Sequence, residues 1–256
     1  MIYGNYFPLH LLSMRPLQLL ILSFFTLIIA VLSLSFTRPV NSDDTFISYT
    51  IDPSKSTLKL YWRNDKNEPL RSLQALKDYC ASKGEKLLFA MNGGMYTEDR
   101  QPLGLYIENG KTLHAINKRT GSGNFYLQPN GILYINKDQT VRICTTAQFG
   151  NGSNVLYATQ SGPMLLVNGQ INTVFTSGSV NTNIRNGVGL LPGNRLLFAM
   201  SKAPVNFYDF ANFFKQAGCS NALYLDGFVS RTYLPEKNWL QTSGDFGVMI
   251  GATQKQ

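Results

Sequence analysis

One carboxylate in this sequence stands at the end of an apolar run, a position from which a side chain can act on a bound molecule. Ala222–Leu225 are apolar and lead directly into Asp226 and Gly227. The run predicts a short buried strand with Asp226 at its C-terminal tip, followed by a glycine that lets the chain turn. A carboxylate is costly to bury without partners. Asp226 is therefore either a reacting group or the cap of the following turn.

A second apolar run ends in small and polar residues of a kind that contact ligands. Lys86–Met91 reads as a strand, and Asn92, Gly93 and Gly94 follow it directly. Glycine weakens regular structure and is used where φ is unusual or where another group approaches the backbone. The Asn92 side chain offers both a donor and an acceptor. This loop is either a tight turn or a ligand-contacting loop, and the residues alone leave both open.

The two strand tips resemble each other in spacing. In the first segment a helical pattern is followed by Gly84, a strand and Asn92, and in the second by Gly218, a strand and Asp226. Eight positions separate the glycine from the polar residue in both segments. The parallel predicts two similar, pseudo-symmetric αβ units whose strand tips converge on one site. A chance similarity between two helix–strand segments is the alternative.

Histidine and cysteine usage excludes several common kinds of site. The chain has two histidines, His10 in the N-terminal leader and His114 in the body, so a multi-histidine metal site is excluded. We expect His114 to be structural, on a surface strand. Cys80, Cys144 and Cys219 form no C-x-x-C pair, which argues against zinc and thioredoxin-type sites. No G-x-S-x-G elbow of an α/β-hydrolase is present.

The net charge of +8 is spread along the chain. Lysines and arginines form no run of five or six, whereas a nucleic-acid groove shows a concentrated basic stripe. We therefore expect no nucleic-acid partner. The charge fits either anionic partners, such as phosphate-bearing glycans, anionic lipid or wall polymer, or a solvated basic surface without a role.

The N-terminal stretch has the features of a targeting segment. Leu17–Phe36 runs for twenty residues without a charge, with Arg15 before it and Arg38 after it. This length can span a bilayer, and the pattern also fits a secretory signal peptide. No A-x-A cleavage site stands out, which slightly favours an uncleaved membrane anchor through residues 17–36. We expect residues 1–42 to be signal peptide or anchor with a linker, and residues 43–256 to form one exported domain, secreted or periplasmic if the leader is cleaved.

The body reads as an α+β fold. Thr45–Asp52 and Ser56–Arg63 alternate apolar and polar residues, which predicts a hairpin or two adjacent strands. Apolar residues recur every three or four positions in Pro69–Gly84 and Asn206–Ala217, which predicts two helices. Asn109-Gly110 predicts a hairpin turn. Further strands are expected at Phe125–Leu127, Ile132–Asn136, Leu156–Gln160, Met164–Val167, Val188–Leu191, Arg195–Met200 and Phe246–Gly251. We expect a mixed, mostly antiparallel sheet core with two packed helices, after an N-terminal hydrophobic helix.

Six motifs in order point to a known family. They are FAMNGGMY, PLGLYIENGK, ATQSGPMLLVNG, RNGVG, PVNFYDFA and ALYLDGFVS. Together they resemble bacterial members of the phosphodiester glycosidase family, the family of the uncovering enzyme N-acetylglucosamine-1-phosphodiester alpha-N-acetylglucosaminidase. The resemblance spans roughly Leu58–Gly251. It implies hydrolysis that removes a sugar from a sugar-1-phosphodiester. Together with the leader, this predicts an exported hydrolase that acts on a glycan or cell-envelope polymer.

The resemblance also implies site positions in this chain. The catalytic positions are Asp226, Arg185 and Asn92, and the substrate-binding positions are Gly93, Gly94, Ser161, Gly162, Gly227 and Ser230. The sequence departs from the family pattern next to Asp226, where Phe228 and Val229 replace small residues and Arg231 stands where relatives often have Ser.

The residue types at these positions suit the chemistry. An arginine such as Arg185 can bind phosphate with two parallel hydrogen bonds, although a solvated arginine beside a turn is the alternative. Asp226 is the expected nucleophile or general base. Phosphate is a good leaving group, so strong acid assistance is not required. Backbone N–H groups of Gly93 and Gly94 are candidate oxyanion donors.

Two further questions are left open by the residues. A second carboxylate, if the reaction needs one, would come from Glu98, Asp99, Glu108, Asp209 or Asp245, with the first two favoured because they follow the Gly-Gly loop. The residues assign no cofactor, and a Ca²⁺ bound by Asp226 and loop carbonyls is an option, although no loop has the spacing of a known calcium motif.

Two other functions compete with hydrolysis of a glycosyl phosphodiester. Phe228 and Val229 beside the candidate carboxylate fit a non-catalytic glycan-binding protein at the cell surface. The basic charge fits a general phosphodiesterase acting on nucleotides or lipids. A glycosidase acting on a glycosyl phosphodiester cleaves the sugar C–O bond, whereas a general phosphodiesterase cleaves the P–O bond.

Overall fold

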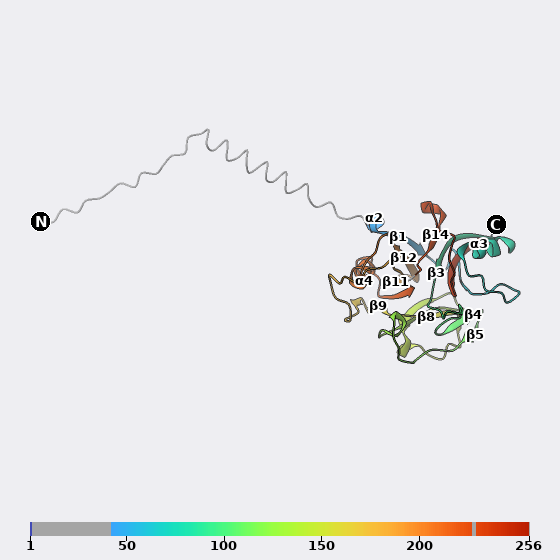
Figure 1. Ribbon diagram of the computed structural model, residues 1–256, viewed down its shortest axis with the longest axis horizontal. Helices are drawn as coiled ribbons and strands as arrows, with labels where there is room; N and C mark the ends of the chain where they lie inside the picture. Colours follow the sequence, from blue (N-terminus) through green and yellow to red (C-terminus); the bar gives the residue numbers. More distant parts are fainter. Residues whose placement is uncertain (2–41, 227–228, 256) are drawn as a thin grey trace, which may run out of the picture. The chain divides into compact units, whose positions relative to one another are not determined.

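The described part of the chain is built mostly of antiparallel strands. The computed structural model describes Met1, residues 42–226 and residues 229–255. The residues from Ser42 onward form one unit (Figure 1). The leader expected at residues 17–36, like Gly227 and Phe228, lies outside the described residues. Within the described ranges, no helix is long and apolar enough to cross a membrane.

Three sheets make up this unit. The six-stranded sheet has the order β1 (Phe46–Ile51), β12 (Arg195–Ser201), β11 (Asn186–Leu191), β13 (Asn221–Asp226), β9 (Met164–Val167) and β10 (Gln170–Ile171). One five-stranded sheet has the order β15 (Trp239–Leu240), β14 (Thr232–Leu234), β3 (Glu85–Asn92), β16 (Met249–Lys255) and β2 (Thr57–Tyr61). The other has the order β5 (Lys111–His114), β4 (Tyr106–Glu108), β8 (Val155–Ser161), β6 (Gly131–Asn136) and β7 (Val141–Thr145).

The sheet core is antiparallel as expected, but it is not mixed. Every pairing among the described strands is antiparallel, including those of the central strands β3, β8 and β13. Antiparallel neighbours need only short connections, which fits the many Gly and Asn turns of the sequence.

The core lies where the inner faces of the three sheets meet. Phe89 of β3, Leu133 of β6, Phe198 of β12 and Leu223 of β13 are all buried in one cluster. The rings of Phe89 and Phe198 pack against each other across two sheets at a tilt of 41°, with centroids 5.1 Å apart. Each such side chain contributes about 1.5–3 kcal/mol when it is fully buried, so this cluster holds the sheets together.

Two helices cover the outer faces of two sheets, as the sequence predicts. Helix α3 (Leu73–Ser82) begins where Ser72 Oγ accepts from the N–H of Ala75, and α4 (Phe207–Gln216) begins where Asn206 Oδ1 accepts from the N–H of Asp209. The helices lie on opposite sides of the strands (Figure 1). The short helices are α2 (Ser42–Thr45), η1 (Asn124–Tyr126), η2 (Thr146–Gln148) and η3 (Pro235–Lys237).

Two strand predictions are wrong. The first two strands do not pair with each other, because β1 pairs with β12 and β2 pairs with β16 in another sheet. The turn between them is satisfied locally, with Asp52 Oδ1 accepting from the N–H of Ser54, so it does not dictate a hairpin. Phe125–Leu127 is not a strand, since the 3-10 helix η1 occupies it. The Asn109-Gly110 hairpin is confirmed between β4 and β5.

The two helix–strand units lie in different sheets, and their strand tips meet. Helix α3 packs its buried face near β3, and α4 packs near β13. Asn92 at the end of β3 donates to Asp226 at the end of β13 over 2.9 Å. The predicted convergence of the two tips is therefore confirmed, and it defines the centre of the candidate site.

Candidate active site

A buried network of amides holds the Asp226 carboxylate. Asp226 is 8% exposed, and Asn92 and Asn186 are fully buried beside it. Asn92 Nδ2 donates to Asp226 Oδ2 over 2.9 Å, and Asn186 Nδ2 donates to Asn92 O and Oδ1 over 2.9 and 3.0 Å. Asn186 Oδ1 accepts from the N–H of Asp226 over 2.8 Å, and Asn92 Oδ1 also accepts from the N–H of Arg231. These bonds assign both amides one orientation and fix the carboxylate in place.

The backbone of β13 departs from regular pairing where it presents Asp226. Asn186 pairs with Asp226, but the next residue, Gly187, pairs with Tyr224, so Leu225 is an extra residue on β13. Such a bulge bends a strand and redirects the side chain that follows it. Gly187 allows this close approach, because a Cβ there would lie 2.9 Å from Leu223 O.

The two glycines after Asn92 serve close packing. A Cβ on Gly93 would overlap the Ile250 side chain, and a Cβ on Gly94, which has φ +123°, would overlap Thr159 Oγ1. The N–H of Gly93 donates to Val248 O over 2.9 Å, so the expectation that it serves as an oxyanion donor is wrong. Because a side chain at Gly93 or Gly94 would clash, the two glycines allow the loop after Asn92 to pack closely against β8 and β16.

The two predicted serines support the tip of β13. Ser161 Oγ donates to Leu225 O over 2.7 Å, and Ser230 Oγ donates to Asp226 O over 2.9 Å. Gly162 leads into a cis bond with Pro163, and a Cβ on it would lie 2.8 Å from Phe125 O. The structure therefore brings these residues to the candidate site, where the hydroxyls are bonded to the backbone that carries Asp226.

Arg185 does not lie at the surface, where an arginine that binds phosphate is expected. It is 1% exposed. Its guanidinium donates to Val205 O over 2.8 Å, to Asn181 O over 2.9 Å and to the Tyr224 hydroxyl over 3.4 Å, and it stacks 3.7 Å from the centre of the Phe207 ring. Burial lowers the pKa of Arg185, while its hydrogen bonds hold the charge in place. The guanidinium is thus committed to internal partners.

Asp226 opens into a cavity of about 320 Å³, near the lower end of the usual range for small-molecule sites. Its walls are Met95, Tyr96, Leu103, Ser122, Gly123, Asn124, Phe125, Tyr126, Asp226 and Val229. Asp226 is the one carboxylate among these described wall residues. The aromatic and amide groups around it can bind a polar ring that also has apolar faces.

Tyr96 and Asn186 are the site residues that sequence reasoning missed. Burial, together with the charge of Asp226, raises the pKa of Tyr96 to about 12. The Tyr96 hydroxyl therefore stays protonated at neutral pH and can donate a hydrogen bond into the cavity. Their positions in the sequence could have indicated both residues, since Tyr96 lies two residues after the Gly-Gly pair and Asn186 directly follows Arg185.

The structure does not bring a second predicted carboxylate to Asp226. The candidates Glu98, Asp99, Glu108, Asp209 and Asp245 are absent from the described walls of the cavity. Asp245 accepts from Arg71 and Arg100, which lower its pKa. Across the described ranges, no three His, Cys, Asp or Glu side chains gather as a metal site. Calcium binding stays a prediction.

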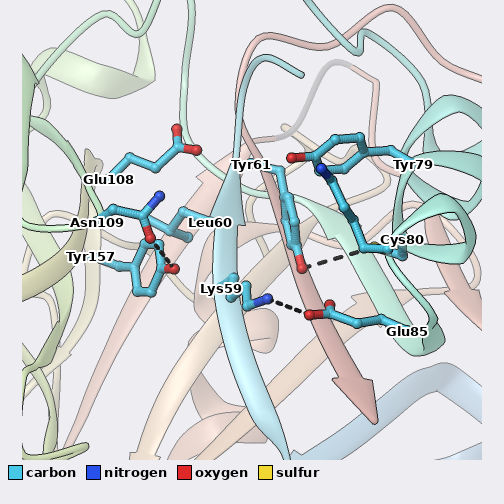
Figure 2. A pocket seen from close by; sticks show the side chains of 10 residues that line it. Lys59, Leu60, Tyr61, Tyr79, Cys80, Glu85, Glu108, Asn109 and Tyr157 are labelled. Atoms are coloured by element: carbon cyan, nitrogen blue, oxygen red, sulfur yellow. Dashed lines mark hydrogen bonds and ion pairs between the residues drawn. The ribbon is translucent and has the colours of Figure 1, made fainter. Parts of the chain in front are cut away.

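A second hollow of about 250 Å³ lies at the other end of β3 (Figure 2). Glu85 at the start of β3 lines it, and Asn92 is seven residues further along, roughly 23 Å at ~3.3 Å per residue. Among its charged groups, Lys59 pairs with Glu85 over 2.7 Å, Lys83 pairs with Asp65, and Glu108 accepts from the Tyr106 hydroxyl over 2.8 Å. This hollow is separate from Asp226 and we assign it no part in the reaction.

The fold and the site together define a β-rich protein with a fixed carboxylate in a cavity of small-molecule size. The sequence model of the phosphodiester glycosidase family matches residues 85–248, which is more than half of the chain. This chain belongs to the phosphodiester glycosidase family, and the resemblance carried by the six sequence motifs is confirmed.

Relatives from bacteria and a vertebrate share the sequence or the fold. An uncharacterised Escherichia coli (strain K12) protein, YigE, is 39% identical over 191 residues, which is 74% of each chain. The catalytic domain of zebrafish N-acetylglucosamine-1-phosphodiester alpha-N-acetylglucosaminidase, auto-inhibited by its pro-peptide, has a TM-score of 0.56 at 17% identity, covering 80% of this chain and 82% of that one. A Burkholderia pseudomallei protein provisionally classed as exported has a TM-score of 0.54 at 10% identity, covering 81% and 73%. At these identities the two solved structures show a shared fold.

Proposed function

We propose that this protein is a glycosidase that releases the sugar from a sugar-1-phosphodiester. The observation that carries the proposal is the single carboxylate, Asp226, among the described walls of the cavity. Enzymes that cleave ordinary glycosides use a pair of carboxylates, one of which protonates the departing alcohol. A phosphomonoester departs as a stable anion and needs little protonation. A site with one fixed carboxylate therefore suits a glycosyl phosphate better than an ordinary glycoside.

Asp226 acts on the anomeric carbon in this proposal. As a nucleophile it forms a bond to C1 while the C1–O bond breaks, and the phosphomonoester leaves with the electron pair; water then hydrolyses the glycosyl-enzyme. As a general base it takes a proton from a water that attacks C1 in one step. In both routes Asn92 and Asn186 hold the carboxylate, and the protonated Tyr96 hydroxyl donates to a sugar oxygen or to the departing oxygen.

The family and the fold guide the choice of substrate. The zebrafish relative acts on an N-acetylglucosamine 1-phosphodiester, which makes that sugar the first to test. The expected leader and the likeness to a Burkholderia protein classed as exported support a body that works outside the cytoplasm on a cell-envelope glycan. Ser161, Gly162 and Ser230 shape the tip that presents Asp226, and Gly94 shapes the loop after Asn92.

The test is sugar release with identification of the broken bond. The purified full chain is incubated with the methyl phosphodiester of N-acetylglucosamine 1-phosphate in ¹⁸O-labelled water, and the products are analysed by mass spectrometry. The proposal predicts ¹⁸O in the sugar and none in the phosphate. Label in the phosphate would show a phosphodiesterase instead. Tight binding of the sugar without release from N-acetylglucosaminyl, glucosyl or galactosyl phosphodiesters would favour a glycan-binding protein, for which Val229 in the cavity wall is the supporting feature.

A further inference from the structure

The cavity that holds Asp226 adjoins a second, larger one. The neighbouring cavity has a volume of about 440 Å³. Leu103 and Tyr126 line both, so the two hollows share a wall. A molecule bound at Asp226 that is longer than one sugar ring can therefore continue over Tyr126 into the second cavity.

The two cavities differ in charge. Asp226 is the one charged residue that lines the first among the residues described. Lys118 and Arg119 line the second, and no carboxylate does within the described part of the chain. Both cations are exposed, and neither forms an ion pair with another described residue. A phosphodiester group is repelled from the Asp226 carboxylate and attracted to this second cavity.

The loop that carries the two cations is tied to a buried side chain. Gln160 is 1% exposed, and its Oε1 accepts from the N–H of Asn117 over 2.9 Å while its Nε2 donates to Asn117 O over 2.7 Å. Asn117 Nδ2 also donates to Leu103 O over 3.0 Å, and Asn117 Oδ1 accepts from the N–H of Arg119 over 3.0 Å. Buried polar groups satisfied in this way fix a local conformation, so the backbone of the cationic pair is held in one place.

The same strand supports both halves of this extended site. Gln160 and Ser161 are neighbours at the end of β8. Gln160 holds the loop before Lys118, and Ser161 Oγ bonds to Leu225 O just before Asp226. Adjacent residues of one strand therefore position the backbone that presents Asp226 and the backbone of the loop that carries Lys118 and Arg119.

We propose that Lys118 and Arg119 form the phosphate subsite, with the sugar bound at Asp226 and the group beyond the phosphate lying in the second cavity. This inference rests on the proposed function, because it divides a glycosyl phosphodiester between the two cavities. It gives the phosphate a place that the internally bonded Arg185 does not offer. The ligand class is a sugar-1-phosphodiester with an organic group beyond the phosphate.

The test compares a charged and a neutral leaving group on the same sugar. The assay compares full-length wild-type protein with the double variant Lys118→Gln/Arg119→Gln. The matched control is Lys66→Gln/Lys86→Gln, which removes two exposed charges elsewhere. Each protein is assayed on benzyl N-acetylglucosaminyl phosphodiester and on p-nitrophenyl N-acetylglucosaminide. We expect the Lys118/Arg119 variant to lose roughly tenfold or more in kcat/KM on the phosphodiester, the size of losing a hydrogen bond to a charged group, and less than about twofold on the neutral glycoside. The control stays within about twofold on both.

The outcomes separate this inference from the proposed function. An equal loss on both substrates, or no loss on either, overturns the phosphate subsite while sugar release upholds the function. If wild-type protein releases no sugar from either substrate, the function fails, and calorimetric titration with the same benzyl phosphodiester decides the subsite. Binding that the Lys118/Arg119 variant loses and the control keeps supports the subsite. Equal binding by both variants, or no binding by wild-type protein, overturns it.

Discussion

Replacing Arg185 by methionine tests whether this residue is a structural element or a phosphate ligand. The substitution keeps an apolar chain of similar length but removes the donors to Val205 O and Asn181 O, both in part-buried surroundings. Each hydrogen bond to a charged group contributes about 1.5–3 kcal/mol, and Val205 O keeps the N–H of Asn183 as a second donor. The stack on Phe207 adds up to about 2 kcal/mol, and part of the total is returned because the buried charge no longer has to be desolvated.

We therefore expect Arg185→Met to lower the free energy of unfolding by about 2–5 kcal/mol. For a chain of this size, 1 kcal/mol corresponds to about 2–4 °C in Tm, so the expected decrease is roughly 4–20 °C. Arg185→Lys should also be destabilising, because an ammonium group cannot reproduce the planar fork. Thermal unfolding followed by circular dichroism measures this directly.

The opposite pattern would refute the structural role. If Arg185 bound phosphate, Arg185→Met would leave Tm within about 1 °C of the wild-type value, and KM would rise for phosphodiesters but not for neutral glycosides. The matched comparison is Arg142→Met, which removes an arginine whose side chain is exposed on β7.

Three further predictions concern the site and one half-buried acid, Glu108. Asn186→Ala removes the acceptor of the Asp226 N–H and a donor to Asn92. We therefore expect kcat to fall about tenfold or more and Tm to decrease. An unchanged kcat would show that the network has no positioning role. Tyr96→Phe should lower kcat without changing the shape of the pH–rate profile between about pH 6 and 9, because the pKa of Tyr96 is about 12; loss of a profile limb in this range would contradict this. Burial raises the pKa of Glu108 above its ordinary 4.5, so its contribution to stability is present below that value and is lost as the pH rises through the folded-state pKa. Glu108→Gln should therefore raise Tm relative to wild type at about pH 8 and lose this advantage near pH 4, and a constant difference would refute the assignment.

The convergence of the two strand tips could be predicted from the sequence. The apolar runs before Asn92 and Asp226 have the length of buried strands, and the helix before each run ends near a glycine with positive φ, Gly84 or Gly218. The helix caps at Ser72 and elsewhere follow equally local rules. Local patterns of this kind carry their own physical cause, which is why the two helices and the two strands that end at Asn92 and Asp226 agree with the structure.

The remaining features depend on long-range packing. No local sequence pattern indicates that β1 and β2 join different sheets, because the turn between them satisfies its own hydrogen bonds. The burial of Arg185 depends on Phe207 and Val205, some twenty residues away. Tyr96 reaches the cavity only because Gly247 lets the backbone pass, as a Cβ there would lie 2.5 Å from Tyr96 Cβ. Such contacts join segments far apart in the chain, so local sequence patterns do not predict them.

The central claim is that Asp226 is the reacting carboxylate, and Asp226→Asn tests it most directly. Release of N-acetylglucosamine from its methyl phosphodiester is followed by NMR for wild type, Asp226→Asn and the exposed-helix control Asp78→Asn, with Tm measured for each. We expect Asp226→Asn to fold and to lose about 10²–10⁴-fold in kcat, while Asp78→Asn retains wild-type activity. Wild-type rates of release by folded Asp226→Asn would contradict the claim.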